Sequence, residues 1–222
     1  MSSQTDTGAA PRTPLSRERV LQAAIALADE HGVEALSMRR LAKELGVEAM
    51  SLYNHVENKD AILDGIIDTV VGEVELPDGP DWKSALRQCA ISTRDVILRH
   101  PWASNLWMSR QSGGPAQLRN GDWKLRMLRE AGFSSDLIYH AFHILDALIL
   151  GFLVQHLSFP YKGDELKEMA ASFLQTFPAD DYPDLMIHIK EHLEPHEGPG
   201  GFAIAVDLIL DGLERLRDAE SS

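Results

Sequence analysis

The sequence predicts an all-α protein in which a small three-helix helix-turn-helix unit precedes a larger helical domain. Three observations support this fold class. Apolar residues recur at helical spacing along most of the 222-residue chain. No run of alternating β-branched residues is bounded by turns, which disfavours a sheet. A Leu-Pro-Asp-Gly-Pro break at 76–80 separates the two parts.

The first 15 residues are polar and lack an apolar core, so we expect a disordered lead-in and not a signal peptide. No run approaches the roughly 18–20 apolar residues that span a bilayer, because polar side chains interrupt the most apolar stretch, 141–157. The single cysteine, Cys89, excludes an internal disulfide and is expected to be a small buried hydrophobe, as in a reducing cytoplasm.

Four helices are expected between residues 16 and 76, the fourth joining the two domains. Three of them begin after a side chain that can accept a hydrogen bond from the first turn, and two end at a glycine, which tolerates positive φ. The third is short and is expected over 49–55. The expected N-caps are Ser16, Ser37 and Asn58, and the closing glycines are Gly32 and Gly46.

The larger domain is expected over 80–218. Its helices are predicted from periodicity and from proline and glycine breaks, which are frequent between 158 and 200. The expected helices cover 82–100, a short stretch after 101, 115–131, 134 or 135 to 157, 164–177, 183–193 and 202–217.

The tight Gly46-Val47 corner between the second and third helices predicts a helix-turn-helix. Gly46 supplies the positive φ of such a turn, and Val47 can fill the small core between the two helices. The second of them fits the major groove of DNA, which is about 12 Å wide. The net charge of −13 argues against unspecific binding to phosphates, yet residues 12–60 carry seven basic and eight acidic side chains and are nearly neutral.

Residues 20–67 resemble the DNA-binding domain of the TetR family. The matching segments are VLQAAIALADEHG, SMRRLAKELGV and LYNHVENKDAIL. Further along, LRQCAISTRDVILRHPWA, KLRMLREAGFSSDLIYHAFHILDALILGFLVQ and FAIAVDLILDGLERL resemble the C-terminal domain of the tetracycline-repressor branch. The resemblance implies a DNA-binding head and a helical domain that binds ligand and dimerises.

The resemblance also implies roles for residues of the head. Tyr53 and Lys59 are expected at phosphates, and Arg39 at a guanine or a phosphate. The apolar Ala49 and Met50 can touch thymine methyls but do not reveal the operator sequence. Core packing of Tyr53 is the alternative, and Arg40 and Lys43 are expected on a solvated face. The expected DNA-binding residues are Ser37, Arg39, Ala49, Met50, Ser51, Tyr53, His55 and Lys59.

Two helices of the larger domain, 135–157 and 202–217, are too apolar to have a face in water. Such helices need cover from their own domain on one side and from a second body on the other. We expect them to pair with their copies about a two-fold axis and form a four-helix interface. The expected interface residues are Leu145, Ile149, Phe152, Ala205, Ile209 and Leu213.

Large aromatic, methionine and histidine side chains from separate helices predict a ligand cavity within 82–157. Ordinary core packing is the alternative for each of them. The expected ligand-binding residues are Trp102, Leu106, Trp107, Met108, Trp123, Met127, Phe142, His143 and His156. Asp146 is expected to bond across the dimer or to a histidine.

The drug–magnesium site of the tetracycline branch is not expected here. Its two histidines align with Glu75 and Trp107, although Glu75 could contact a hydroxylated or cationic ligand. The His188–His192 pair has metal-ligand spacing but no third ligand, so it is expected in solvent. We expect neither a metal nor a cofactor.

Together these features predict a sequence-specific transcriptional regulator, most simply a repressor released from a palindromic operator by a small lipophilic or antibiotic-like effector. The opposite sign, in which the ligand promotes DNA binding, stays open. The rival readings are an enzyme, for which no catalytic constellation is present in a supporting context, and a helical interaction module. The expected partners are double-stranded DNA, the effector and a second copy, with no membrane, in the bacterial cytoplasm at the nucleoid.

Overall fold

A computed structural model describes residues 14–79, 81–110, 113–158, 163–191 and 200–221. These residues form helices and connecting turns and contain no strand, which confirms the all-α prediction. The expected lead-in lies almost wholly outside the described residues. The helices are α1 (Arg17–His31), a 3₁₀ turn η1 (Val33–Ala35), α2 (Met38–Leu45), α3 (Ala49–Leu52), α4 (Lys59–Val71), α5 (Trp82–Arg99), α6 (Ala103–Ser109), α7 (Pro115–Glu130), α8 (Ser135–Ser158), α9 (Gly163–Thr176), α10 (Pro183–Glu191) and α11 (Gly201–Glu220).

The three predicted caps of the head are confirmed. The Ser16 hydroxyl accepts from the Arg19 N–H at 3.2 Å, Ser37 accepts from Arg40 N–H at 3.2 Å, and Asn58 accepts from Ala61 N–H at 2.8 Å. Each bond satisfies a donor that the first helical turn leaves free, which fixes where the helix begins.

Helix α3 is shorter than the sequence predicts, because it ends at Leu52 and not near His55. The chain then turns, with the N–H groups of His55 and Val56 donating to the Leu52 carbonyl at 2.9 and 3.0 Å. The turn leads directly to the Asn58 cap of α4.

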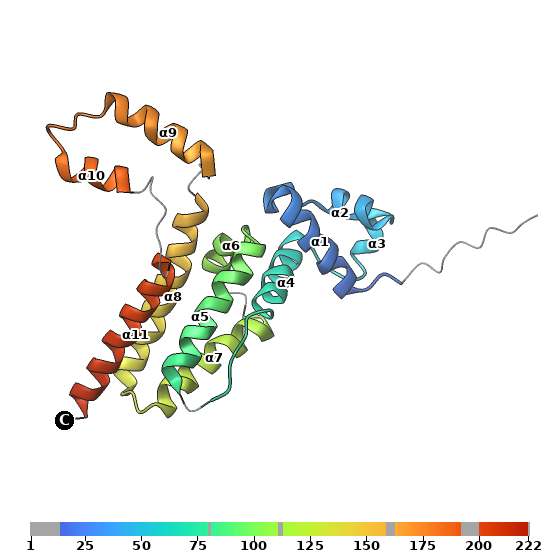
Figure 1. Cartoon of the computed structure of the whole chain (residues 1–222). Helices are drawn as coiled ribbons and strands as arrows, with labels where there is room; N and C mark the ends of the chain where they lie inside the picture. Colours follow the sequence, from blue (N-terminus) through green and yellow to red (C-terminus); the bar gives the residue numbers. More distant parts are fainter. Residues whose placement is uncertain (1–13, 80, 111–112, 159–162, 192–199, 222) are drawn as a thin grey trace, which may run out of the picture.

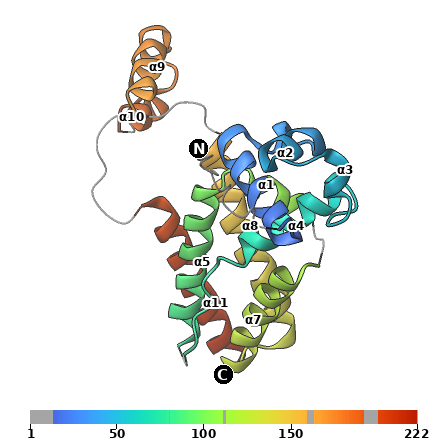
Figure 2. The same cartoon turned by 90° about the vertical axis from the view of Figure 1, so that its right-hand side faces the viewer.

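The head, α1 to α3, lies at one side of the molecule, and α4 connects it to the body (Figure 1). In the body, α8 and α11 run side by side and pack on α5, while α7 packs between α4 and α8 (Figures 1 and 2). The small core of the head is continuous with that of the body through the apolar side of α4. A shift of α4 would therefore disturb the packing of the head and of the body together.

Polar contacts also join head and body. The Asp29 carboxylate of α1 accepts from the Trp102 indole N–H at 2.7 Å and pairs with His100 Nδ1 at 2.8 Å. The Asp68 carboxylate of α4 accepts the N–H groups of Ala116 and Gln117 at 2.9 and 3.0 Å. Asp68 thus caps α7 from a neighbouring helix.

Helices α9 and α10 stand away from the rest of the body (Figures 1 and 2). Their apolar side chains have little cover within this chain. The most exposed are Phe173, Tyr182, Leu185 and Ile187.

By length and composition, α8 is the one described helix that could cross a membrane. Only a third of its most apolar window is buried in the chain. The side that is buried packs on α5, α6, α7 and α11, as expected for a core helix of the body. Its remaining surface needs another cover.

Candidate nucleic-acid interface and ligand cavity

The corner between α2 and α3 has the predicted helix-turn-helix geometry. Gly46 closes α2 in the left-handed conformation, with φ 65° and ψ 35°, a region that side chains with a Cβ rarely adopt. Val47 is partly buried against the core, as predicted. Leu41 and Leu52 are fully buried where the two helices meet. The corner therefore holds α3 rigidly against α2.

The predicted DNA-binding residues gather around this corner. Met50 is 75% exposed at the start of α3, and Tyr53 is 47% exposed just after its end, so Tyr53 is not a core filler. Arg39 and Lys59 are exposed, while His55 and Ser51 are half-buried. Two of the predicted DNA-binding residues also stabilise the fold, because Ser37 caps α2 and Ala49 packs against the core.

The cations of the head differ in pairing from those of the body. Among the described residues no ion pair reaches Arg39, Arg40, Lys43 or Lys59. In the body, carboxylates pair with most of the cations, among them Lys83, Arg87, Arg99, Arg110, Lys124 and Arg217. Arg39 and Lys59, two of the unpaired cations of the head, lie where the helix-turn-helix would meet phosphates.

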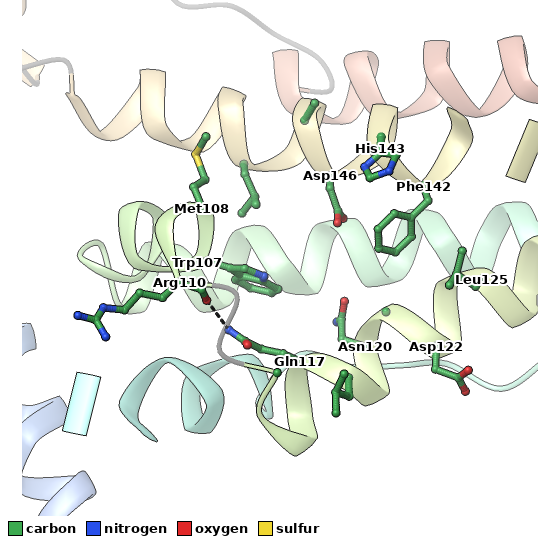
Figure 3. A pocket seen from close by; sticks show the side chains of 15 residues that line it. Trp107, Met108, Arg110, Gln117, Asn120, Asp122, Leu125, Phe142, His143 and Asp146 are labelled. Atoms are coloured by element: carbon green, nitrogen blue, oxygen red, sulfur yellow. Dashed lines mark hydrogen bonds between the residues drawn. The ribbon is translucent and has the colours of Figure 1, made fainter. Parts of the chain in front are cut away.

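A cavity of about 750 Å³ lies between α6, α7 and α8. This volume suits a small organic molecule. The exposed side chains of Met108 and Leu118 belong to its lining. The ring of Phe142 and the indole of Trp107 face its interior (Figure 3).

The structure places four of the nine predicted ligand residues on the cavity wall: Trp107, Met108, Phe142 and His143. The other five do not line this cavity. Trp102 bonds Asp29 at the head, and Trp123, Met127 and Leu106 pack into the core. His156 is exposed and does not line the cavity either.

Polar residues of the cavity were missed by the sequence reasoning. Aromatic and methionine content directed it to apolar positions, whereas the wall also includes Arg110, Gln117, Asn120, Asp122 and Asp146. A spacing of three residues on α7 puts Gln117 and Asn120 on one face, and this periodicity was the available signal. Glu75 does not line the cavity; its carboxylate accepts from Gln88 instead, at 3.3 Å.

Asp146 pairs with a lysine of its own chain, and no histidine among the described residues bonds to it. Its Oδ1 accepts from Lys124 Nζ at 2.6 Å, and the Lys124 side chain is only 5% exposed. The Lys124 ammonium is therefore buried together with its counter-charge, the usual condition for a buried cation.

Arg110 lies between the cavity and α4. Its carbonyl accepts from the Gln117 side-chain amide at 3.3 Å on the cavity side (Figure 3). Its guanidinium donates to Asp64 at 2.9 Å and also to Asp60, one turn earlier on α4. These two carboxylates raise the pKa of Arg110 above its usual value, so the cation is permanent. Asp60 directly follows Lys59 of the head.

Three of the six expected dimer residues are turned inward. Leu145, Ile149 and Leu213 are at most 3% exposed within one chain, so they belong to its own core and cannot face a partner. Phe152 packs on Phe202 with ring centroids 5.3 Å apart, and Ala205 and Ile209 are half-buried. The outward stripe of α8 and α11 carries other residues, which periodicity did not single out: Ile144, Ile204, Leu208 and Leu216.

Among the described residues no group of three or more metal-ligating side chains occurs. His188 lies on α10, while His192 is outside the described part of the chain. Cys89 is buried, as predicted, and burial raises the pKa of its thiol.

The geometry defines a class: a helix-turn-helix head with free cations, joined by one helix to an all-helical body with a cavity. Two family models match the chain, one described as "Bacterial regulatory proteins, tetR family" over residues 20–66 and one as "Tetracyclin repressor-like, C-terminal domain" over residues 76–217. The chain belongs to the TetR family.

Individual relatives agree with this assignment. An HTH-type transcriptional regulator of Saccharopolyspora erythraea is 41% identical over 54% of this chain, which spans about half (51%) of that relative's length. The class C tetracycline repressor protein of Escherichia coli is 30% identical over 91% of this chain and 92% of its own. The solved structure of ActR of Streptomyces coelicolor with actinorhodin superposes with a TM-score of 0.78, at 27% identity, covering 92% of this chain and 99% of that one.

Proposed function

We propose that this protein is a sequence-specific transcriptional repressor that a small lipophilic or antibiotic-like ligand releases from its operator. The observation that carries the proposal is the Arg110 bridge, which links a cavity to the helix that bears the DNA-binding head. Residues 16–76 bind DNA, and residues 80–218 bind ligand and dimerise. The protein acts in the cytoplasm, at the nucleoid, and is not an enzyme.

The head binds through two kinds of contact. Tyr53, Lys59 and His55 hold phosphates, because they lie exposed or half-buried at the junction of α3 and α4. Lys59 adds its ammonium to the free N–H groups of the first turn of α4, a favourable place for an anion. Arg39 and Met50 project toward base edges, and Ser51 and Ala49 flank them.

A second copy covers the outward faces of α8 and α11. Leu208 is 64% exposed, Leu216 55% and Ile204 47%, an apolar stripe that a lone soluble chain would leave in water. Pairing of identical stripes about a two-fold axis explains why α8 is as apolar as a membrane helix without any bilayer. The two heads of such a dimer read a palindrome at about 34–36 Å spacing or a multiple of it.

The ligand acts through α4. It binds between α6, α7 and α8, where Arg110, Gln117 and the start of α7 line the cavity or lie beside it. Those same segments hold Asp60, Asp64 and Asp68 of α4. A ligand that prefers one packing of α6 and α7 therefore biases the position of α4 and the separation of the heads. The complex of ActR with actinorhodin and the names of the tetracycline repressors support a ligand of this general kind.

The test uses DNA from upstream of the protein's own gene and fluorescence anisotropy at several salt concentrations. Lys59→Ala removes one phosphate contact in each of two subunits, so the slope of log K against log salt should fall in magnitude by about 1.8. Lys43→Ala is the control, since it removes an exposed cation of the same head that is expected in solvent. Binding that is equally strong and equally salt-dependent in all three proteins would contradict the proposal.

A further inference from the structure

Asn120 on α7 has an unused hydrogen-bond donor at the cavity wall. The residue is only 4% exposed, and its Nδ2 has no partner within the part of the chain that the structure describes. A buried amide without a partner loses stability relative to an apolar side chain of the same shape. Such a group is therefore best explained by a ligand atom that accepts its hydrogen bond.

Asp146 on α8 offers a hydrogen-bond acceptor to the same cavity. Its Oδ1 is held by Lys124, while no hydrogen bond from a described residue reaches Oδ2. About a third of its side chain is exposed (32%), and it lines the cavity. Asp146 and Asn120 point into the cavity from two facing helices (Figure 3). One cavity thus contains an unpaired donor, Asn120 Nδ2, and an unpaired acceptor, Asp146 Oδ2.

The buried lysine decides which donor suits Asp146. Lys124 already compensates the carboxylate charge, so a second cation entering the cavity would lose its hydration and meet a neutral ion pair. Two other charged residues line the cavity: Arg110, which Asp60 and Asp64 neutralise, and Asp122, whose exposed side chain stays hydrated. A neutral hydroxyl, by contrast, can donate to the free carboxylate oxygen without a large desolvation cost.

The walls favour a flat ligand. The indole of Trp107 and the ring of Phe142 lie on either side of the Asn120–Asp146 pair (Figure 3), and Leu125 and Leu150 complete an apolar lining. Aromatic rings prefer offset or edge contacts with other aromatic rings.

We propose that the ligand is a neutral, flat aromatic molecule with a hydroxyl that donates to Asp146 and a carbonyl that accepts from Asn120. This inference rests on the proposed function only in taking the cavity as the effector site. It excludes amines that are cationic at neutral pH and purely hydrocarbon ligands.

Four commercial probes of nearly equal size separate these chemistries. They are 2-(hydroxymethyl)anthraquinone, 2-methylanthraquinone without the hydroxyl, 2-(aminomethyl)anthraquinone with a cation, and 2-(hydroxymethyl)anthracene without carbonyls. Equilibrium dialysis against the full chain, without DNA, gives each Kd. The first probe should bind about tenfold more tightly than each of the others. A single hydrogen bond to a charged or buried group contributes about this factor in Kd.

Asn120→Leu tests the orphan donor directly. It should raise the Tm of the free protein, because an unpaired buried amide is removed, and abolish the preference for the anthraquinone over the anthracene. Trp123→Phe is the matched control: Trp123 Nε1 is the other buried donor without a described partner, but the residue does not line the cavity. It should leave all four affinities unchanged.

Asp146 is tested with its counter-ion. Asp146→Asn alone would leave Lys124 buried and unpaired, so the double substitution Lys124→Gln with Asp146→Asn keeps a neutral bonded pair. It should reduce the preference for the hydroxymethyl over the methyl compound to about twofold, since a neutral acceptor replaces a charged one.

Binding led by the aminomethyl compound, equal affinity for all four, or no binding of any would overturn the inference. A fall in Tm on Asn120→Leu would do so too, because it would show that a bound water already satisfies the amide. Operator binding, measured separately on unliganded protein, distinguishes these outcomes from failure of the proposed function: an intact DNA reader with no probe selectivity refutes only the ligand chemistry.

Discussion

The ion pair between α6 and α4 should transmit the ligand signal, and Asp64→Asn tests this. The substitution keeps the shape of the side chain and removes the charge that faces the Arg110 guanidinium at 2.9 Å. The Asp64 side chain is 41% exposed, so solvent screens the pair. Partly exposed pairs contribute about 0.2–1 kcal/mol. Because Arg110 keeps Asp60, stability should fall only slightly, with a loss of about 1–3 °C in Tm.

The effect on coupling counts the pair twice, because a dimer contains two copies of it. Two pairs correspond to about 0.4–2 kcal/mol, or a factor of about 2 to 30 in an equilibrium constant. We expect the ratio of operator Kd with and without 2-(hydroxymethyl)anthraquinone to shrink by that factor. The assay is fluorescence anisotropy of labelled operator at fixed salt, with and without the compound.

Asp78→Asn is the control for charge alone. Asp78 is exposed in the connection between the domains and has no ion pair among the described residues. It should change neither the ratio nor the Tm. The reasoning is refuted if Asp64→Asn leaves the ratio at the wild-type value while ligand and operator each bind normally, because α4 would then receive the signal by another route.

Three further predictions follow from the fold. Leu208→Glu should convert the dimer to a monomer in sedimentation at micromolar concentration, whereas Leu118→Glu, equally exposed at the cavity mouth (62% against 64%), should leave it dimeric; a dimeric L208E protein would move the interface elsewhere. Asn58→Ala removes the cap of α4 and should lower the free energy of unfolding by about 1 kcal/mol in urea denaturation, and an unchanged midpoint would show that the cap is dispensable. Burial raises the pKa of the Cys89 thiol, so at pH 8 the native protein should hold less thiolate than the unfolded chain. The native protein should therefore react with Ellman's reagent far more slowly than the protein unfolded in guanidinium. Equal rates would contradict the burial of Cys89.

The helix boundaries of the head could be predicted because their determinants are local. Ser37 and Asn58 each bond an N–H three residues further along the chain, and Gly46 needs only its own φ. These interactions depend on neighbours that the sequence itself places side by side. The DNA-facing positions around the corner, such as Met50 and Lys59, were instead implied by the resemblance to the TetR family, and both are exposed.

The cavity and the outward apolar stripe of α8 and α11 could be predicted only in part. Periodicity shows that α8 is apolar on nearly all sides, yet Leu145 faces its own core and Ile144, the preceding residue, faces outward. The two stripes look alike in composition. Which stripe is covered depends on where α5, α7 and α11 pack, and that is a property of the whole fold.

The sequence by itself determined the element order, the caps and the helix-turn-helix corner, since hydrogen bonds across three or four residues and the conformational freedom of glycine decide them. Only the tertiary structure brought Lys124 to Asp146 across 22 residues and Arg110 to Asp64 across 46. Charges attract through space without regard to chain separation, and nothing in a linear pattern says which of many carboxylates will meet a given cation. The polar chemistry of the cavity and its link to the DNA-binding head therefore became visible only in the folded chain.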